Sequence, residues 1–212
     1  MKNNYCTFYI IRHGETEWNV KNLMQGHSDS PLTTNGINQA KETAKKLTSI
    51  KFDEIFSSDL GRAKRTAEII ALEKKIAVKT TQLLREKNLG DYQGKKYSIF
   101  QTELKKYLNE FESLNDESKK KYRYPGMESD EDVVVRFIRF IREIAVAYPN
   151  KTVLISTHAG VIGNFLIHLG IWTYKDQYKK KISNGGYLKL KSDGVDFFLK
   201  EAEGIEVDIP NL

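Results

Sequence analysis

The sequence predicts an α/β fold, a three-layer α/β/α sandwich in which helices cover both faces of a mostly parallel central sheet. Short runs rich in β-branched residues alternate along the chain with segments of helical periodicity, which is typical of β-α-β units. Near the end of the sequence two more strand-like runs flank Asp193-Gly194, a hairpin signal. The sheet is therefore expected to be mixed, with this hairpin as its antiparallel edge.

The individual elements follow from apolar spacing and from capping residues. Strands are expected over residues 8–12, 53–58, 76–81, 151–157, 186–191 and 195–202, and helices over 34–49, 59–73, 129–148 and 161–169. Thr33 or Thr34 can cap the first of these helices. The helix that opens at Ser129 has the clearest start, because Ser-x-x-Asp supplies a capping oxygen and a first-turn carboxylate. Residues 83–94 are expected to form an irregular loop, followed by a charged amphipathic helical region.

Length and composition favour a single globular domain over residues 1–212, since the chain has 212 residues and is 40% hydrophobic. No apolar run approaches the roughly 18 residues of a membrane span, and the start of the sequence lacks a secretory pattern. Cys6 is the one cysteine, so no intramolecular disulfide can form. We expect a cytoplasmic protein without a membrane partner.

The formal net charge of +6 favours anionic partners. The lysines are scattered in short clusters such as 119–123 and 179–181, and no nucleic-acid-binding signature is present. We therefore expect a small anionic ligand and no nucleic acid.

Polar residues gather where the predicted strands end. Arg12 closes the first strand and His13 follows it; Arg62 lies one helical turn beyond the second strand; Glu86 lies in the loop after the third; and His158 follows the strand 151–157. In open α/β sheets, ligands bind at the carboxyl ends of the strands. Two histidines, two arginines and one acid are thus predicted to meet at one edge of the sheet.

This set of side chains suits a phosphate ester. Arg12 and Arg62 offer the planar, charged donors that a phosphate dianion requires. His13 can act as a neutral imidazole nucleophile near pH 7, and Glu86 can donate a proton to the leaving alkoxide. His158 can stabilise charge on the transferring group.

Further motifs carry a family resemblance. Arg12-His13-Gly14-Glu15-Thr16 resembles the signature of the histidine phosphatase superfamily, phosphoglycerate-mutase branch, and later blocks at 25–40, 55–70, 125–137 and 155–162 resemble that family in order and spacing. The similarity covers roughly residues 8–190 and implies a phosphoglycerate-mutase-like fold. Two positions depart from the family pattern, since Met127 and Ala159 stand where glycine is common.

The resemblance also implies roles for the residues. His13 becomes the phosphorylated nucleophile, Glu86 the proton donor that later activates water, and Arg12, Arg62 and His158 the phosphate pocket. The substrate-binding set is completed by Asn19, Gln25, Gly26 and Ala159. The resemblance implies no metal and no cofactor.

The same pocket can serve two reactions, in which the phosphoryl group is transferred either to water or to a second hydroxyl of the substrate. Mutases of the family carry Glu-Arg-His-Tyr-Gly and a long insertion, whereas this chain reads Glu86-Lys87-Asn88-Leu89-Gly90 with about forty residues before Pro125. We therefore expect a phosphatase, with residues 95–128 as a cap over the site. Phosphoserine is the favoured substrate, because Arg85 and Lys87 flank the acid and suit a carboxylate.

Two alternatives remain, a cofactor-dependent phosphoglycerate mutase and a non-catalytic protein that binds a phosphorylated ligand. The second would require the loss of His13 or Glu86, and both are present.

Other patterns carry less weight. Asp130-Glu131-Asp132 matches a motif of magnesium-dependent phosphatases, but that motif belongs at a strand end and these acids open a helix. His27 and His168 have no partner at metal-ligand spacing and are expected to be surface or packed residues. The tail 204–212 alternates apolar residues and is expected to add a strand, fold over the site or form a homodimer contact.

Overall fold

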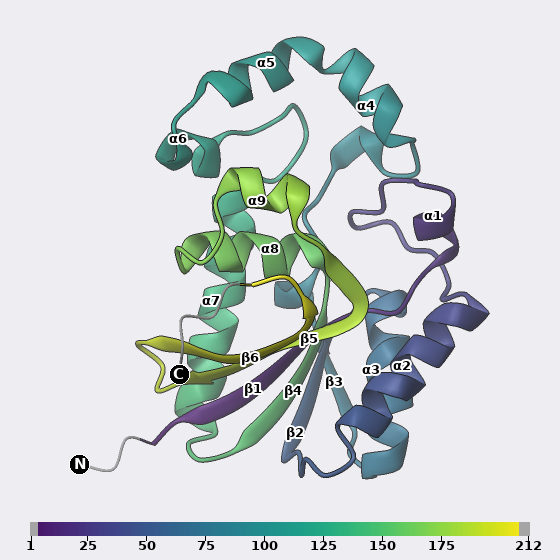
Figure 1. The fold of residues 1–212 in the computed structure, drawn as a ribbon, viewed down its shortest axis with the longest axis vertical. Coiled ribbons are helices and arrows are strands. Elements are labelled where there is room, and N and C mark those ends of the chain that lie inside the picture. The colour runs from purple at the N-terminus through teal and green to yellow at the C-terminus, as the bar shows by residue number, and fades with distance from the viewer. Residues whose placement is uncertain (1–3, 208–212) are drawn as a thin grey trace.

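A six-stranded mixed sheet forms the centre of the structure, a computed structural model that describes residues 4–207 apart from the side chain of Tyr178 (Figure 1). The strand order is β3-β2-β4-β1-β5-β6. Their bounds are β1 Cys6–Arg12, β2 Glu54–Ser58, β3 Val78–Thr81, β4 Thr152–Thr157, β5 Ile182–Ser192 and β6 Phe197–Ile205. The first four strands are parallel, and β5 and β6 form the antiparallel edge. The predicted mixed sheet is confirmed.

Helices cover both faces of this sheet (Figure 1). Successive side chains of a strand point to opposite faces, so Ile10 packs into one apolar cluster and Ile11 into the other. The cluster around Ile11 includes residues of α2 (Thr34–Lys46) and α3 (Gly61–Lys74). The cluster around Ile10 includes residues of α7 (Asp130–Ala147) and α8 (Ala159–His168). The three-layer sandwich is therefore confirmed as well.

The capping predictions hold for two of these helices. Thr33 accepts a hydrogen bond from the Gly36 amide at the start of α2. At the start of α7, Ser129 accepts from the Asp132 amide, and the Asp132 carboxylate accepts from the Ser129 amide at 2.8 Å. Asp130 and Asp132 thus lie in a capped first turn, as the sequence indicated.

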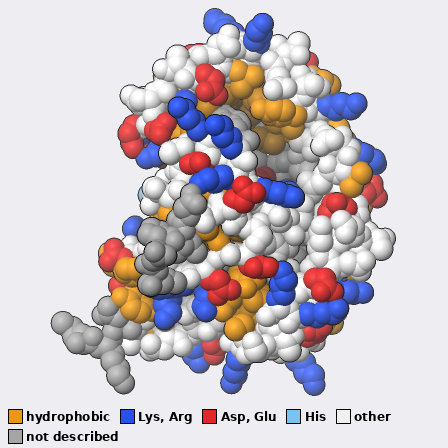
Figure 2. All heavy atoms as spheres, viewed as in Figure 1, with side chains coloured by type: hydrophobic (Ala, Val, Ile, Leu, Met, Phe, Trp, Pro, Cys, Tyr) orange, Lys and Arg blue, Asp and Glu red, His pale blue; other side chains and the backbone are white. Residues whose placement is uncertain are grey.

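Shorter elements complete the described chain. They are α1 Glu17–Val20, the 3-10 turns η1 Gln82–Leu84 and η2 Gly90–Tyr92, and the helices α4 Tyr97–Glu103, α5 Lys105–Ser113, α6 Asp116–Lys121 and α9 Tyr174–Lys179. The helices α4 to α6 arch above the carboxyl ends of the parallel strands in Figure 1. On this face of the molecule, Lys and Arg side chains are interspersed with Asp and Glu side chains (Figure 2). Between residues 4 and 207, no helix has both the length and the apolar character needed to cross a membrane.

The end of the chain differs from the prediction in where its strands begin. β5 starts at Ile182, four residues before the predicted 186, because the Ser-Asn-Gly-Gly stretch belongs to the strand. Gly185 adopts a φ of +75° there, and the pairing with β6 shifts register between Ile182 and Tyr187. Residues 204 and 205 of the tail extend β6, which is one of the three expected roles, whereas Ile209 lies outside the described residues.

Candidate active site

His13 is held at the carboxyl end of β1 by three hydrogen bonds. Its amide donates to the Thr157 carbonyl at 3.0 Å, and its carbonyl accepts from the Asn184 side chain at 2.9 Å. Its ring Nδ1 lies 2.7 Å from the Gly14 carbonyl oxygen. A carbonyl oxygen only accepts, so Nδ1 carries the proton, and in the neutral ring Nε2 keeps a free lone pair.

A second imidazole lies beside the first. The His13 and His158 rings have centroids 5.2 Å apart at 61°. His158 directly follows β4, is fully buried, and has no hydrogen-bond partner for either ring nitrogen within residues 4–207. Burial, followed by the positive charges of nearby arginines, lowers the pKa of both rings well below the usual value. Both imidazoles are therefore neutral at neutral pH.

Two arginines flank these rings. Arg62, in the first turn of α3, is 1% exposed and donates to the carbonyls of Ser28 and Gly26 at 2.8 and 2.7 Å. Its Nη1 also lies 3.0 Å from Asp29 Oδ1. Arg12 ends β1 and donates to the Ile182 carbonyl. Among the described residues, neither arginine Nε has a partner, although both atoms are buried, so each retains a donor for a ligand.

Glu86 lies in the loop between η1 and η2. Its Oε2 accepts a hydrogen bond from the Gly160 amide at 3.0 Å, and its Oε1 accepts from the Lys87 amide at 2.9 Å. A Cβ atom at position 160 would overlap the carboxylate. Glycine at the start of α8 therefore permits the acid to lie directly against the first turn of this helix.

These side chains surround one cavity of about 270 Å³. All of the residues predicted for the site line this cavity except His158. The His158 ring packs against the ring of His13. The wall consists of Arg12, His13, Asn19, Leu23, Gln25, Gly26, Arg62, Glu86, Lys87, Leu89, Ala159 and Gly160.

The smaller members of the wall have distinct environments. The amide oxygen of Asn19 accepts from the Thr16 amide at 3.1 Å, which leaves its nitrogen for a ligand. Gln25 is buried, and its Oε1 has no partner in the described part of the chain. Gly26 adopts a φ of +55°, which favours glycine, and its carbonyl holds Arg62.

The two departures from the family pattern leave the backbone unstrained. Among residues 4–207, the non-glycine residues with positive φ are Asn22, Lys75 and Asn150. Met127 and Ala159 are thus in ordinary conformations, and Ala159 is the first residue of α8.

Sequence reasoning missed the contacts that hold the Glu86 loop. Arg136, on α7, donates to the carbonyl of Glu86 and to that of Leu83, both at 2.9 Å, and pairs with Glu128 at 3.2 Å. His27 Nε2 donates to the same Glu86 carbonyl at 2.8 Å. Burial is the largest influence on the pKa of His27 and lowers it, in keeping with a neutral N–H donor. These bonds reach backbone atoms, which no side-chain spacing in the sequence reveals.

The two cations that flank the acid in sequence have different surroundings. The Arg85 guanidinium binds both carboxylate oxygens of Asp59, at 2.7 and 2.6 Å, and does not line the cavity. Lys87 does line it, and its ammonium contacts Asp130 at 2.8 Å. Lys87 is therefore the one of the two that lines the cavity.

Comparisons with known proteins identify a family and several relatives of this chain. The model of the histidine phosphatase superfamily (branch 1) matches residues 8–203. An uncharacterized phosphatase, PhoE, of Bacillus subtilis (strain 168) is 33% identical over 160 residues, which cover 76% of this chain and 75% of that protein. A probable phosphoglycerate mutase, GpmB, of Proteus mirabilis (strain HI4320) is 45% identical over 95 residues, which cover 45% of this chain and 44% of that protein.

Solved structures show the same architecture. The structure of Bacillus stearothermophilus YhfR matches with a TM-score of 0.82 at 30% sequence identity, covering 94% of this chain and 96% of that one. The match of the family model to most of the chain, together with this likeness in fold, is decisive. The chain belongs to the histidine phosphatase superfamily, branch 1.

Proposed function

We propose that this enzyme hydrolyses a small phosphomonoester without a metal ion, through a phosphohistidine formed on His13. The observation that carries the proposal is the environment of one atom. His13 Nε2 bears a lone pair because Nδ1 donates to the Gly14 carbonyl, and two arginines with unpaired Nε donors flank the same cavity. A nucleophile and an anion pocket therefore share one wall.

The pocket supplies the charge that a phosphate dianion requires. Arg12 and Arg62 are buried enough that burial lowers the pKa of each, and both remain cationic because a guanidinium starts from so high a value. The amide-bearing end of α8 adds a partial positive charge at Ala159 and Gly160. These groups perform the neutralisation for which other phosphatases use metal ions.

The first chemical step transfers the phosphoryl group. His13 Nε2 forms a bond to phosphorus while the ester P–O bond breaks, and protonated Glu86 gives its proton to the departing alkoxide. In the second step Glu86 takes a proton from water, the water oxygen bonds to phosphorus, and the P–N bond breaks. His158 packs against the His13 ring and has no partner for either ring nitrogen among the described residues, so a small rotation of its ring toward the cavity lets it donate to an equatorial oxygen in both steps.

We further propose that the substrate carries a carboxylate, with phosphoserine as the favoured example. Lys87 supports this assignment because it lines the cavity and its ammonium uses one of three N–H donors on Asp130, which leaves two for a carboxylate. Arg85 gives no support because it lies outside the cavity and binds both oxygens of Asp59. Residues 95–128 are proposed to cap the site. The start of this segment is joined to the cavity wall, since the Met24 amide donates to the Lys95 carbonyl at 2.9 Å and Leu23 bridges to Lys96.

The titration of His13 tests its neutral state. Its pKa in the folded enzyme lies well below that of the unfolded chain, about 6.5, so at pH 6.5 the folded ring stays neutral. Below pH 6.5 His13 is protonated in the unfolded chain but not in the folded enzyme. The free energy of unfolding should therefore fall as the pH is lowered below 6.5. Ring C–H signals followed by NMR, assigned with His13→Asn, measure the pKa. A midpoint at or above 6.5 would contradict the account.

Leaving-group chemistry tests Glu86. In Glu86→Gln, hydrolysis of an alkyl phosphate should slow by about 10²–10⁴, because the alkoxide then leaves without a proton. 4-Nitrophenolate leaves unaided, so 4-nitrophenyl phosphate should give a rapid burst of one equivalent per chain followed by slow turnover. Stopped-flow absorbance measures both phases. Exposed Glu17→Gln is the matched control and should behave as wild type; equal slowing of both substrates without a burst would refute the assignment.

The reaction itself is tested with a panel of metabolites. Phosphoserine should release free phosphate faster than phosphoethanolamine, which lacks the carboxylate, and a chelator should leave the rate unchanged. Phosphate release is measured by a coupled colorimetric assay. A strong preference for a sugar phosphate would exclude the phosphoserine assignment, and conversion of 3-phosphoglycerate into 2-phosphoglycerate at a comparable rate would show a mutase instead.

Lys87→Gln provides the control for this panel. It should reduce the preference for phosphoserine over phosphoethanolamine by raising KM for phosphoserine, whereas Lys41→Gln on the exposed face of α2 should not. An unchanged preference in Lys87→Gln would remove the lysine from substrate recognition while leaving the phosphohistidine mechanism intact.

A further inference from the structure

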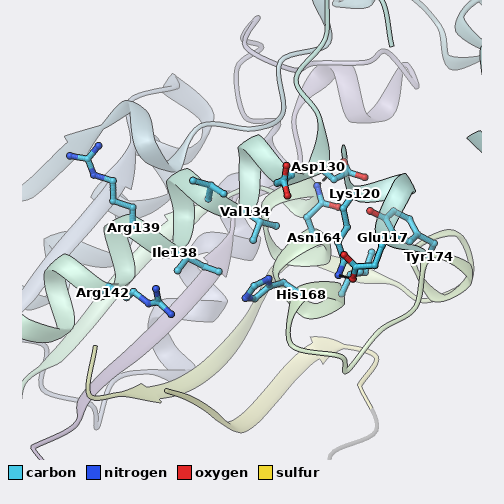
Figure 3. A pocket seen from close by; sticks show the side chains of 13 residues that line it. Glu117, Lys120, Asp130, Val134, Ile138, Arg139, Arg142, Asn164, His168 and Tyr174 are labelled. Atoms are coloured by element: carbon cyan, nitrogen blue, oxygen red, sulfur yellow. Dashed lines mark hydrogen bonds and ion pairs between the residues drawn. The ribbon is translucent and has the colours of Figure 1, made fainter. Parts of the chain in front are cut away.

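A second cavity, of about 500 Å³, lies among α6, α7, α8 and α9 (Figure 3). Its volume falls within the range of small-molecule sites. No residue of its wall also lines the catalytic cavity, as far as the described chain extends. The two cavities are separated by Asp130, which lines the second cavity and contacts Lys87 of the first. This space therefore requires an explanation of its own.

One wall of this second cavity is apolar. Val134 and Ile138 stand one helical turn apart on α7, and Ile167 of α8 also lines the wall. Ile138 and Ile167 are buried, while the neighbouring Val135 is 60% exposed. An apolar chain laid against these residues would lose contact with water along its length. The wall favours a ligand with a hydrocarbon or aromatic body.

One end of the cavity is cationic. Figure 3 shows Arg142 and Ile138 projecting from α7 toward His168, which lies at the end of α8. The pKa of His168 is lowered by partial desolvation and by the charges of Lys120 and Arg142, so both cations act on the ring. Lys120 pairs with Glu117, whereas Arg142 has no carboxylate partner between residues 4 and 207 and rests on the Phe197 ring, 5.7 Å from its centre. The Arg142 guanidinium is therefore available to pair with an anion.

The acidic residues of the wall do not prevent an anion from binding at the cationic end. The Asp130 carboxylate is neutralised by Lys87 at 2.8 Å and accepts a hydrogen bond from the side-chain Nδ2 of Asn164 at 3.1 Å. Glu131 opens α7 and stands eleven residues before Arg142, which is roughly 16 Å along a helix with a rise of about 1.5 Å per residue. Negative charge thus gathers at one end of the cavity and unpaired positive charge at the other.

We propose that this second cavity binds a small amphipathic organic anion, a monocarboxylate with a medium-length hydrocarbon chain. The chain lies along Val134, Ile138 and Ile167, and the carboxylate lies between Arg142 and His168. Charge complementarity selects an anion over a cation, and the apolar wall selects an amphiphile over inorganic phosphate.

Calorimetric titration of the full chain with decanoate tests the proposal. We expect one decanoate per chain, with an affinity that saturating inorganic phosphate changes less than about twofold, because phosphate fills the other cavity. Decanol and decyltrimethylammonium should bind at least about tenfold more weakly, since they lack the anionic head. Absence of saturable binding, or displacement of decanoate by phosphate, would overturn the proposal.

Variants assign the binding to this cavity. Arg142→Glu should weaken decanoate binding at least about tenfold, and Val134→Phe should weaken it by filling the space beside the apolar wall. Arg65→Glu, the same charge reversal on exposed α3, is the matched control and should bind as wild type. Circular dichroism checks that each variant is folded. Equal decanoate affinity in wild type, Arg142→Glu and Val134→Phe would contradict the assignment.

Discussion

The hydrogen bond from His13 Nδ1 to the Gly14 carbonyl is the interaction on which the rest of the site depends. It fixes the tautomer, so the lone pair lies on Nε2. Burial and two neighbouring arginines then keep the ring neutral by lowering its pKa. The arginines proposed to hold a phosphate thus also keep the proposed nucleophile unprotonated. Because the backbone of His13 is anchored at the strand end, the sheet sets the position from which the imidazole faces the cavity.

The arginines of the pocket are held by backbone carbonyls as well as by acids. Arg62 is almost fully buried; its side chain hydrogen-bonds one carboxylate, that of Asp29, and two carbonyls, those of Ser28 and Gly26. The Asp29 pair and the carbonyl partners occupy Nη1 and Nη2 and orient the guanidinium, so its Nε donor remains unpaired among the described residues. The loop at residues 25–29 therefore shapes the pocket through its main chain, which is where the positive φ of Gly26 matters.

Periodicity and capping signals were sufficient to predict the sheet, the major helices and the edge at which the site lies. Arg12, His13 and His158 were found because each directly follows a β-branched run. The short helices α1 and α9 were not predicted, because segments of only four and six residues, respectively, show no clear helical periodicity. Contacts to backbone atoms, such as those of His27 and Arg136 with the Glu86 carbonyl, leave no trace in residue spacing. Neutralisation of Arg85 by Asp59 joins residues of different elements and needed the fold.

Trapping the covalent intermediate tests the central claim most directly. The enzyme is mixed with phosphate-labelled substrate, quenched within the first turnover under alkaline conditions that preserve phosphohistidine, and digested for mass spectrometry. The account predicts a phosphoryl group on the peptide that contains His13, formed at least as fast as turnover and missing in His13→Asn. Turnover without any labelled His13, or a label on another residue that persists in His13→Asn, would contradict it.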